Sequence, residues 1–108
     1  MYIPFQEMPD QARIWVYQAS RSLQASEIDQ ITQTITEACH AWEAHGAPLQ
    51  ASFEIRYEQV IIVAVNEAMN AASGCSIDAS TRWFKSLGES FQVDFFNRDL
   101  AVVRNEQV

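Results

Sequence analysis

Val60-Ile61-Ile62-Val63-Ala64-Val65 is an unbroken apolar run in the middle of the chain. Its β-branched composition favours a strand, and the absence of polar residues indicates that both faces of that strand are covered. Just before it, apolar and polar residues alternate from Leu49 to Tyr57. This alternation predicts a second strand with one face in solvent, at the edge of a sheet. A short turn around Glu58-Gln59 would join the two strands into a hairpin.

Two more strands are predicted towards the ends of the chain. Residues 13–19 are rich in β-branched and aromatic side chains and are apolar on both faces, which is typical of an inner strand. Residues 100–103 are predicted to form a short last strand. Pro4 and Pro9 interrupt residues 1–12, which we expect to form an irregular N-terminal arm laid over the body of the protein.

Two amphipathic helices are predicted, one before and one after the hairpin. The first begins at Ser26–Asp29, a capping box with Asp in place of Glu, and is stopped by residues 46–48, which hold Gly and Pro. The second covers about residues 78–90, with Ser76 or Asp78 as its N-cap. The positions expected to face the core are Ile28, Ile31, Ile35, Ala38 or Cys39, and Trp42 in the first helix, and Ile77, Thr81, Phe84, Leu87 or Gly88, and Phe91 in the second.

The order strand, helix, strand, strand, helix, strand predicts a single α+β domain over residues 1–108 with the ferredoxin-like split βαβ fold. In that fold an antiparallel sheet carries two helices on one face, with the first and third strands in the middle. The apolar residues on the other face then need a cover. We expect this cover to be the N-terminal arm, a symmetric partner subunit, or both, so a homodimer is predicted.

The charge balance limits the classes of partner. Acidic residues number 14 against 7 basic residues, a formal net charge of −7. Such a chain repels phosphate groups, so nucleic acid and anionic membranes are not expected partners unless basic residues cluster in space. The residues that would have to cluster are Arg13, Arg82, Lys85, Arg98 and Arg104. The sequence shows neither a signal peptide nor a membrane-spanning run, so we expect a cytoplasmic location without membrane association.

The outer face of the first predicted helix is acidic, and no basic residue occurs between Arg21 and Arg56. Its acidic residues are Glu27, Asp29, Glu37 and Glu43. Such a face is most often solvated surface, and the alternative is a docking face for a basic partner.

The stretch from Ala71 to Ser80 concentrates small and turn-forming residues between the central strand and the second helix. Gly74 permits a positive φ, and the unpaired N–H groups of a helix start favour an anion. The predicted anion-binding residues are Ser73, Gly74, Cys75, Ser76 and Asp78. The alternative interpretation is an ordinary capped helix start, which the negative charge of Asp78 favours.

Cys75 is also the candidate nucleophile, with His45 or His40 as its base. No third residue is spaced to orient either histidine. Cys39 and Cys75 match no zinc spacing and are expected to be free thiols. His40 and His45 are five residues apart, which does not place them on one helix face. We therefore predict no metal and no cofactor.

Phosphate binding by a P-loop is not predicted. Ser73-Gly74-Cys75-Ser76 begins somewhat like the glycine-rich loop, but Ile77 and Asp78 stand where a second glycine and a lysine are required. No lysine precedes Lys85.

Several segments nevertheless resemble a family of small, single-domain bacterial proteins. The resemblance spans nearly the whole chain and lies in Met1–Pro9, His45-Gly46, Ala51-Ser52-Phe53, Ala72–Asp78 and Asp94–Arg98. Members of this family often bear an automatic label of ABC transporter ATPase. The resemblance thus implies a bacterial protein that handles ATP beside a transporter, and it supplies no catalytic residues.

Three functions follow, in order of preference. The first is a non-enzymatic dimerising module that binds a protein or a small anion. The second is a thiol-dependent enzyme or redox sensor that uses Cys75. The third is the ATP-linked role, which rests on the family label and has no supporting motif in this chain.

Overall fold

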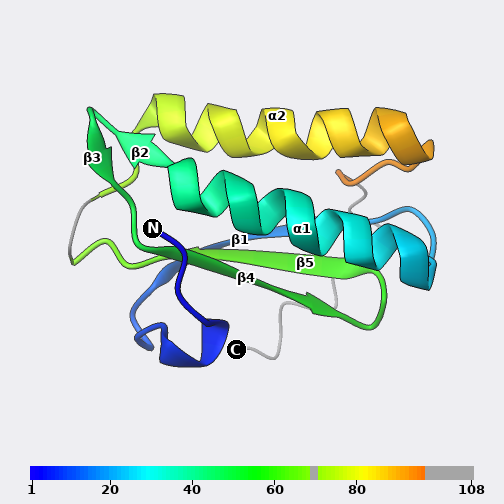
Figure 1. Cartoon of the computed structure of the whole chain (residues 1–108), viewed down its shortest axis with the longest axis horizontal. Helices are drawn as coiled ribbons and strands as arrows, with labels where there is room; N and C mark the ends of the chain where they lie inside the picture. Colours follow the sequence, from blue (N-terminus) through cyan, green and yellow to red (C-terminus); the bar gives the residue numbers. More distant parts are fainter. Residues whose placement is uncertain (69–70, 97–108) are drawn as a thin grey trace.

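A three-stranded antiparallel sheet covered on one face by two helices forms the body of the protein (Figure 1). A computed structural model describes residues 1–68 and 71–96 of the chain. The elements in chain order are η1 (Phe5–Glu7), β1 (Arg13–Gln18), α1 (Ala25–Ala41), β2 (Glu43–Ala44), β3 (Ala47–Pro48), β4 (Ala51–Arg56), β5 (Val60–Val65) and α2 (Gly74–Phe91). The predicted α+β class, with an antiparallel sheet and two helices, is confirmed.

The apolar run at residues 60–65 is the central strand, as predicted. The strand order is β1-β5-β4, and β5 pairs antiparallel with both neighbours. The register places Val63 between Trp15 of β1 and Phe53 of β4. On its other side, β1 forms one isolated bridge, from Gln18 to Phe96. The strand predicted at residues 100–103 lies outside the described residues.

The hairpin between β4 and β5 turns one residue earlier than predicted. Tyr57 and Glu58 both have positive φ, 58° and 57°, and the N–H of Gln59 donates to the carbonyl of Arg56 at 3.1 Å. A turn with two positive φ angles matches the twist of paired strands, but Gly or Asn usually occupies it. Tyr and Glu give no such signal in the sequence.

The core lies between the sheet and the helices and contains stacked aromatic rings. Tyr17 stacks on Phe84 of α2 with ring centroids 4.0 Å apart, and its hydroxyl lies 2.9 Å from the hydroxyl of Ser80. The helix periodicity predicted most of the core correctly. The buried residues are Ile31, Ile35, Cys39 and Trp42 from α1 and its C-cap, and Ser76, Ser80, Phe84, Leu87 and Gly88 from α2. The small serines are buried in α2, whereas Ile77 and Thr81 are only half-buried.

Helix α1 begins and ends earlier than predicted. Its N-cap is Gln24, whose N–H donates to the carboxylate of Glu27 at 2.9 Å, so the capping box lies two residues before the predicted one. The helix ends at Ala41, because Trp42 turns into an extended conformation with its indole held against α2. The chain then forms the short β2–β3 hairpin, which the sequence did not predict. Its turn has positive φ at His45 and Gly46, 54° and 80°.

The start of α1 carries a testable pH dependence. Arg21 donates two hydrogen bonds to the carboxylate of Glu27, at 2.9 and 2.8 Å. These bonds and the bond from Gln24 lower the pKa of Glu27 from 4.5 to about 2. A depressed carboxyl pKa stabilises the fold above the unfolded value, and this stabilisation is lost as the pH falls from 4.5 towards 2.

We therefore expect wild-type protein to lose stability between pH 4.5 and pH 2 more steeply than Glu27→Gln. Urea denaturation at a series of pH values, followed by circular dichroism, measures the difference. Glu37→Gln, on the exposed part of the same helix, is the matched control and should follow the wild type. If the free energy of unfolding changed with pH in the same way for the wild type and Glu27→Gln, the Arg21–Glu27 ion pair would not stabilise the fold.

The second face of the sheet is covered only in part by the described residues. The N-terminal arm pairs with the first residue of β4, since the N–H of Ile3 donates to the carbonyl of Ala51 at 3.0 Å and the N–H of Ala51 donates to the carbonyl of Met1 at 2.8 Å. Element η1 then lies on the side of the sheet away from the helices (Figure 1). Ser52, predicted to face solvent, is fully buried next to this arm. On β1, by contrast, Ile14 and Val16 remain 53% and 51% exposed.

Candidate functional site

The start of α2 is capped by the residues that were predicted to bind an anion. The helix begins at Gly74, not at residue 78, and Ser73 is its N-cap. The N–H of Ser76 donates to the hydroxyl oxygen of Ser73 at 3.1 Å, and the N–H of Ser73 donates to that of Ser76 at 2.7 Å. The prediction of Ser76 or Asp78 as the N-cap was wrong. Ser73 is the N-cap, and its reciprocal hydrogen bonds with Ser76 allow the helix to begin at Gly74, four residues before the predicted start.

The predicted special backbone at Gly74 is also absent. Among the described glycines only Gly46 has a positive φ, and a Cβ built on Gly74 would meet no atom within 4 Å. Gly74 is an ordinary residue in the first turn of the helix. Its position makes no close backbone approach, so a larger side chain would fit there.

Few features at this helix start favour an anion. Ser73 and Ser76 use their N–H groups for capping, and the N–H of Ala72 donates to the carboxylate of Glu67 at 3.0 Å. That carboxylate adds negative charge close to the helix start, and Asp78 is exposed one turn further on. Of the five predicted residues, Ser73, Cys75 and Ser76 line a cleft, described next, whereas Gly74 and Asp78 do not.

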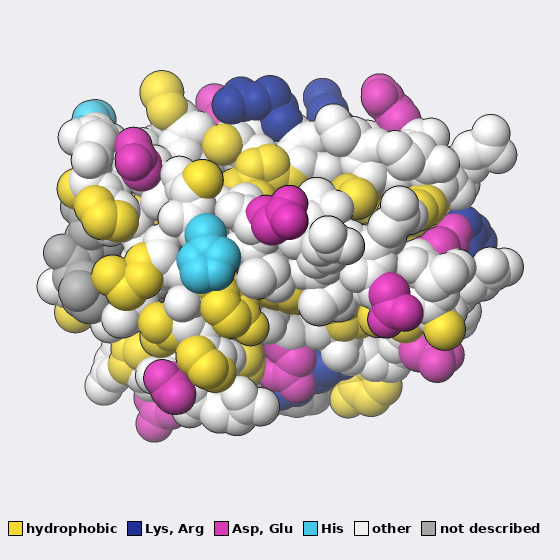
Figure 2. Space-filling model, viewed as in Figure 1, with side chains coloured by type: hydrophobic (Ala, Val, Ile, Leu, Met, Phe, Trp, Pro, Cys, Tyr) yellow, Lys and Arg dark blue, Asp and Glu magenta, His cyan; other side chains and the backbone are white. Residues whose placement is uncertain are grey.

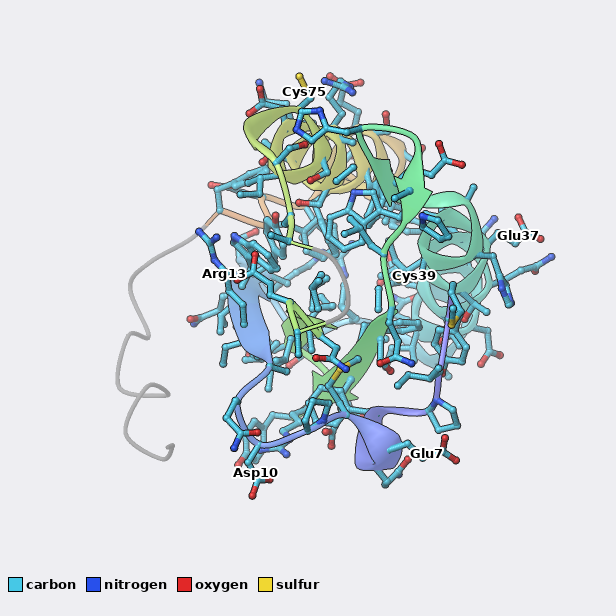
Figure 3. All side chains as sticks on the ribbon, turned by 90° about the vertical axis from the view of Figure 1, so that its left-hand side faces the viewer. Glu7, Asp10, Arg13, Glu37, Cys39 and Cys75 are labelled. Carbon is cyan, nitrogen blue, oxygen red and sulfur yellow. The ribbon has the colours of Figure 1, made fainter. Side chains whose placement is uncertain are left out.

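A cleft of about 560 Å³ lies between the β2–β3 hairpin, the end of α1 and the start of α2. We call it the hairpin cleft. Its lining residues are Ala38, Ala41, Trp42, Glu43, His45, Ser73, Cys75, Ser76, Ala79 and Trp83. The structure thus brings Cys75 and His45 to one cleft, although they lie on different elements. Figure 3 shows Cys75 at the outer surface of α2, where its thiol is exposed.

Trp42 holds the hairpin cleft in shape. Its indole N–H donates to the carbonyl of Ser76 at 2.9 Å, and its ring meets that of Trp83 in a T-shaped contact with centroids 4.8 Å apart. On its other side Trp42 contacts Trp15 of β1 at 6.2 Å. All three tryptophans of the chain therefore lie in one connected row from the sheet to the cleft.

The other predicted base and the other thiol lie elsewhere. His40 is exposed and packs its ring 5.8 Å from that of Tyr2, outside the cleft lining. Cys39 is buried on the inner side of α1, and its burial raises the pKa of the thiol to about 12, an effect that the nearby N-terminal ammonium partly offsets. Cys39 is thus kept as a neutral thiol, and Cys75 is the accessible cysteine.

Sequence reasoning missed Trp83 as a site residue, and it named Glu43 only as part of an acidic helix face whose alternative role was to dock a basic partner. Glu43 was assigned to a solvated helix face, yet it begins strand β2 and lines the cleft. Trp83 lies between the predicted core positions of α2 and had no role. Within residues 1–68 and 71–96, no group of three His, Cys, Asp or Glu side chains could hold a metal ion.

Comparisons with protein-family models, with curated proteins and with solved structures each found no match to this chain. In the part of the chain that the structure describes, neither helix is long and apolar enough to cross a membrane.

Proposed function

We propose that this protein is a non-enzymatic cytoplasmic module that forms homodimers through the sheet face opposite its helices. The observation that carries the proposal is the pair Ile14 and Val16, each about half exposed on β1. Trp15 and Tyr17 contact rings beneath the helices, so the alternation of a strand directs Ile14 and Val16 to the other face. Val16 lies opposite the partly exposed Ile62 in the register of β5.

Such a surface favours association because apolar area on a sheet gains free energy when a second copy removes it from water. A symmetric dimer uses the same patch twice, so one exposed patch suffices. The arm covers the β4 side of this face and leaves the β1 side open for contact. The patch of Ile14, Val16 and Ile62 is the centre of the proposed interface.

We also propose the ferredoxin-like arrangement as the complete fold. The order β1-β5-β4, with α1 between β1 and β4, agrees with the first three strands of the split βαβ topology. In that topology a fourth strand pairs antiparallel with the outer edge of β1, where the described residues form one parallel bridge, from Gln18 to Phe96. A strand added at that edge would extend the sheet sideways and would not itself cover the face that carries Ile14 and Val16.

Sedimentation velocity over a concentration series tests the dimer. We expect the wild type to dimerise and Val16→Ser to raise the dissociation constant by at least about tenfold, as for a central apolar interface residue. Tyr57→Asn removes another exposed apolar side chain, 76% exposed in the β4–β5 turn, and should leave dimerisation unchanged. A wild type that sediments as a monomer at every concentration would refute the proposal.

A thiol-dependent enzyme is the second candidate, because Cys75 and His45 line the same cleft. A histidine near a thiol can take its proton and produce the reactive thiolate. Alkylation of Cys75 by iodoacetamide, measured against pH, tests this role. A reactivity midpoint below about pH 7 that His45→Gln moves upward would support the enzyme, and a midpoint at or above about 8.5 would refute it.

The role in ATP handling rests on the family resemblance alone. The start of α2 has neither the lysine nor the second glycine of a P-loop, and the carboxylate of Glu67 accepts a hydrogen bond just before it. ATP hydrolysis by the purified chain above background would support this third role.

A further inference from the structure

The lining of the hairpin cleft combines an acidic side chain with an exposed part of an indole and contains no Lys or Arg. None of its lining residues is Lys or Arg, and its one acidic residue is Glu43. Among the described residues, no ion pair involves the exposed carboxylate of Glu43. Small apolar side chains, Ala38, Ala41 and Ala79, leave room beside the partly exposed indole of Trp83. A carboxylate and an indole thus line a cleft that contains His45 but no Lys or Arg.

Elsewhere in this protein an indole and a carboxylate together bind the guanidinium group of an arginine. The guanidinium carbon of Arg13 lies 4.9 Å from the centroid of the Trp15 ring, within the range of a cation–π interaction. The same guanidinium lies 3.5 Å from the carboxylate of Glu67. An indole and a carboxylate together bind one arginine there. Trp83 and Glu43 provide the same two groups in the hairpin cleft.

The α1 side of the cleft adds a long-range attraction for positive charge. The chain carries a net charge of −7, and α1, which ends at the cleft, contains no Lys or Arg. Figure 2 shows acidic side chains spread over the face that carries α1, whereas basic side chains in this view gather along α2 and at the margins. A ligand with several positive charges would be attracted to this face before it reached the cleft.

The openness of the cleft favours a side chain of a larger partner over a free small molecule. Glu43, His45 and Cys75 are all exposed at its rim. Pockets for small molecules usually bury most of the ligand surface, whereas this cleft lies open to solvent. A peptide that lies across the surface can place one side chain in the cleft and bring its remaining charges to the acidic face.

We propose that the hairpin cleft binds an arginine side chain of a basic peptide segment of a partner protein, between the indole of Trp83 and the carboxylate of Glu43. The guanidinium is preferred to the ammonium of lysine, because its planar group stacks on an indole while it donates hydrogen bonds to a carboxylate. This proposal does not rest on the proposed dimer, because the cleft lies on the helix side of the sheet and Ile14 and Val16 face the other side.

Titration calorimetry with an acetylated oligo-arginine peptide tests the site. Glu43→Lys should weaken binding by about tenfold, because it removes one attraction and adds a repulsion. Glu37→Lys makes the same change in net charge on α1, where Glu37 points outward and away from Cys75 (Figure 3). Glu37→Lys should weaken binding by less than about twofold, since it changes only a distant surface charge whose effect on the peptide is screened by salt. Equal losses for the two variants would refute a specific site.

The indole has its own test. Trp83→Leu keeps an apolar side chain but removes the π surface, and should weaken binding by about three- to tenfold. Oligo-citrulline, which keeps the shape of the peptide without its charge, should not bind. Free N-acetyl-arginine amide should bind much more weakly than the peptide. If it binds as tightly, the peptide occupant is wrong.

Cys75 provides a direct report of the position of the peptide. It lines the cleft, and it is the exposed one of the two cysteines. Bound oligo-arginine should slow alkylation of Cys75 by iodoacetamide, and Glu43→Lys should largely remove that protection at a peptide concentration near the wild-type dissociation constant. Binding without protection would place the peptide elsewhere and overturn the proposal. The Val16→Ser variant should bind the peptide as the wild type does, so failure of the dimer and failure of this site are distinguishable.

Discussion

Trp42→Ala is expected to lower the free energy of unfolding by about 3–5 kcal/mol, the usual range for removal of a large buried aromatic side chain. Trp42 is 4% exposed and lies between the rings of Trp15 and Trp83. Its removal leaves a cavity in the layer that joins the β2–β3 hairpin to α2. It also leaves the carbonyl of Ser76 without its indole donor. A loss of this size is a large part of the stability of an ordinary domain.

Two matched variants separate the contributions of Trp42. Trp42→Phe keeps most of the apolar contact but removes the hydrogen bond to Ser76, a net effect of about 1 kcal/mol in addition to the smaller ring. Trp83→Ala removes a partly exposed ring from the same row and should cost less than Trp42→Ala. Urea denaturation followed by far-ultraviolet circular dichroism measures all three. If Trp42→Ala and Trp83→Ala lowered the free energy of unfolding equally, the burial of the ring would not determine the size of the loss.

Gly88→Ala is expected to destabilise the protein by about 1–3 kcal/mol through overpacking near the end of α2. A Cβ at Gly88 would lie 2.5 Å from the carbonyl oxygen of Val93, which is a backbone atom and cannot move aside alone. The carbonyl of Gly88 also accepts the N–H groups of Gln92 and Val93. These bonds hold the chain that leaves the helix directly over Gly88. The added methyl group must therefore displace this whole helix end.

Gly74→Ala is the control for Gly88→Ala. Gly74 occupies the first turn of the same helix, where a Cβ meets nothing within 4 Å, so alanine should be neutral or stabilise by up to about 1 kcal/mol. The denaturation midpoint in urea measures both variants. If both variants lost the same stability, the close contact between a Cβ at position 88 and the carbonyl oxygen of Val93 would not be the cause of the loss, and the prediction would be wrong.

The apolar run of the central strand and the helical spacing of α1 were the most reliable guides to the fold. The apolar run at residues 60–65 was predicted to be central, and the structure places β5 between two antiparallel neighbours. The spacing of Ile31, Ile35 and Cys39 predicted the buried stripe of α1. Both patterns come from burial on a regular element, so they are visible in the sequence before any contact is known.

The element ends were less predictable, because side-chain hydrogen bonds decide them. Ser73 and Ser76 start α2, although Ser76 and Asp78 were equally plausible caps by residue type. The capping box of α1 uses Gln24 and Glu27, whereas the sequence favoured the serine two residues later. Several residues near each helix start could act as a cap, and the packing of the helix on the sheet selects one of them.

The hairpin cleft could not be derived from the sequence. Cys75 and His45 were proposed as partners, but nothing in their spacing indicated that they would share a cleft or that Glu43 and Trp83 would join them. These residues lie on two elements separated by β4 and β5. Only the packing of α2 beside the end of α1, secured by the indole of Trp42, brings them together.

By itself the sequence determined the class of the fold, the central strand and the buried stripe of α1, because hydrophobic periodicity is a local property that one element carries alone. The tertiary structure decided where each helix begins, which apolar residues of β1 remain exposed, and which side chains line the hairpin cleft. These features depend on contacts between residues far apart in the chain, and the pairing of an indole with a distant carbonyl leaves no periodic signal in either segment.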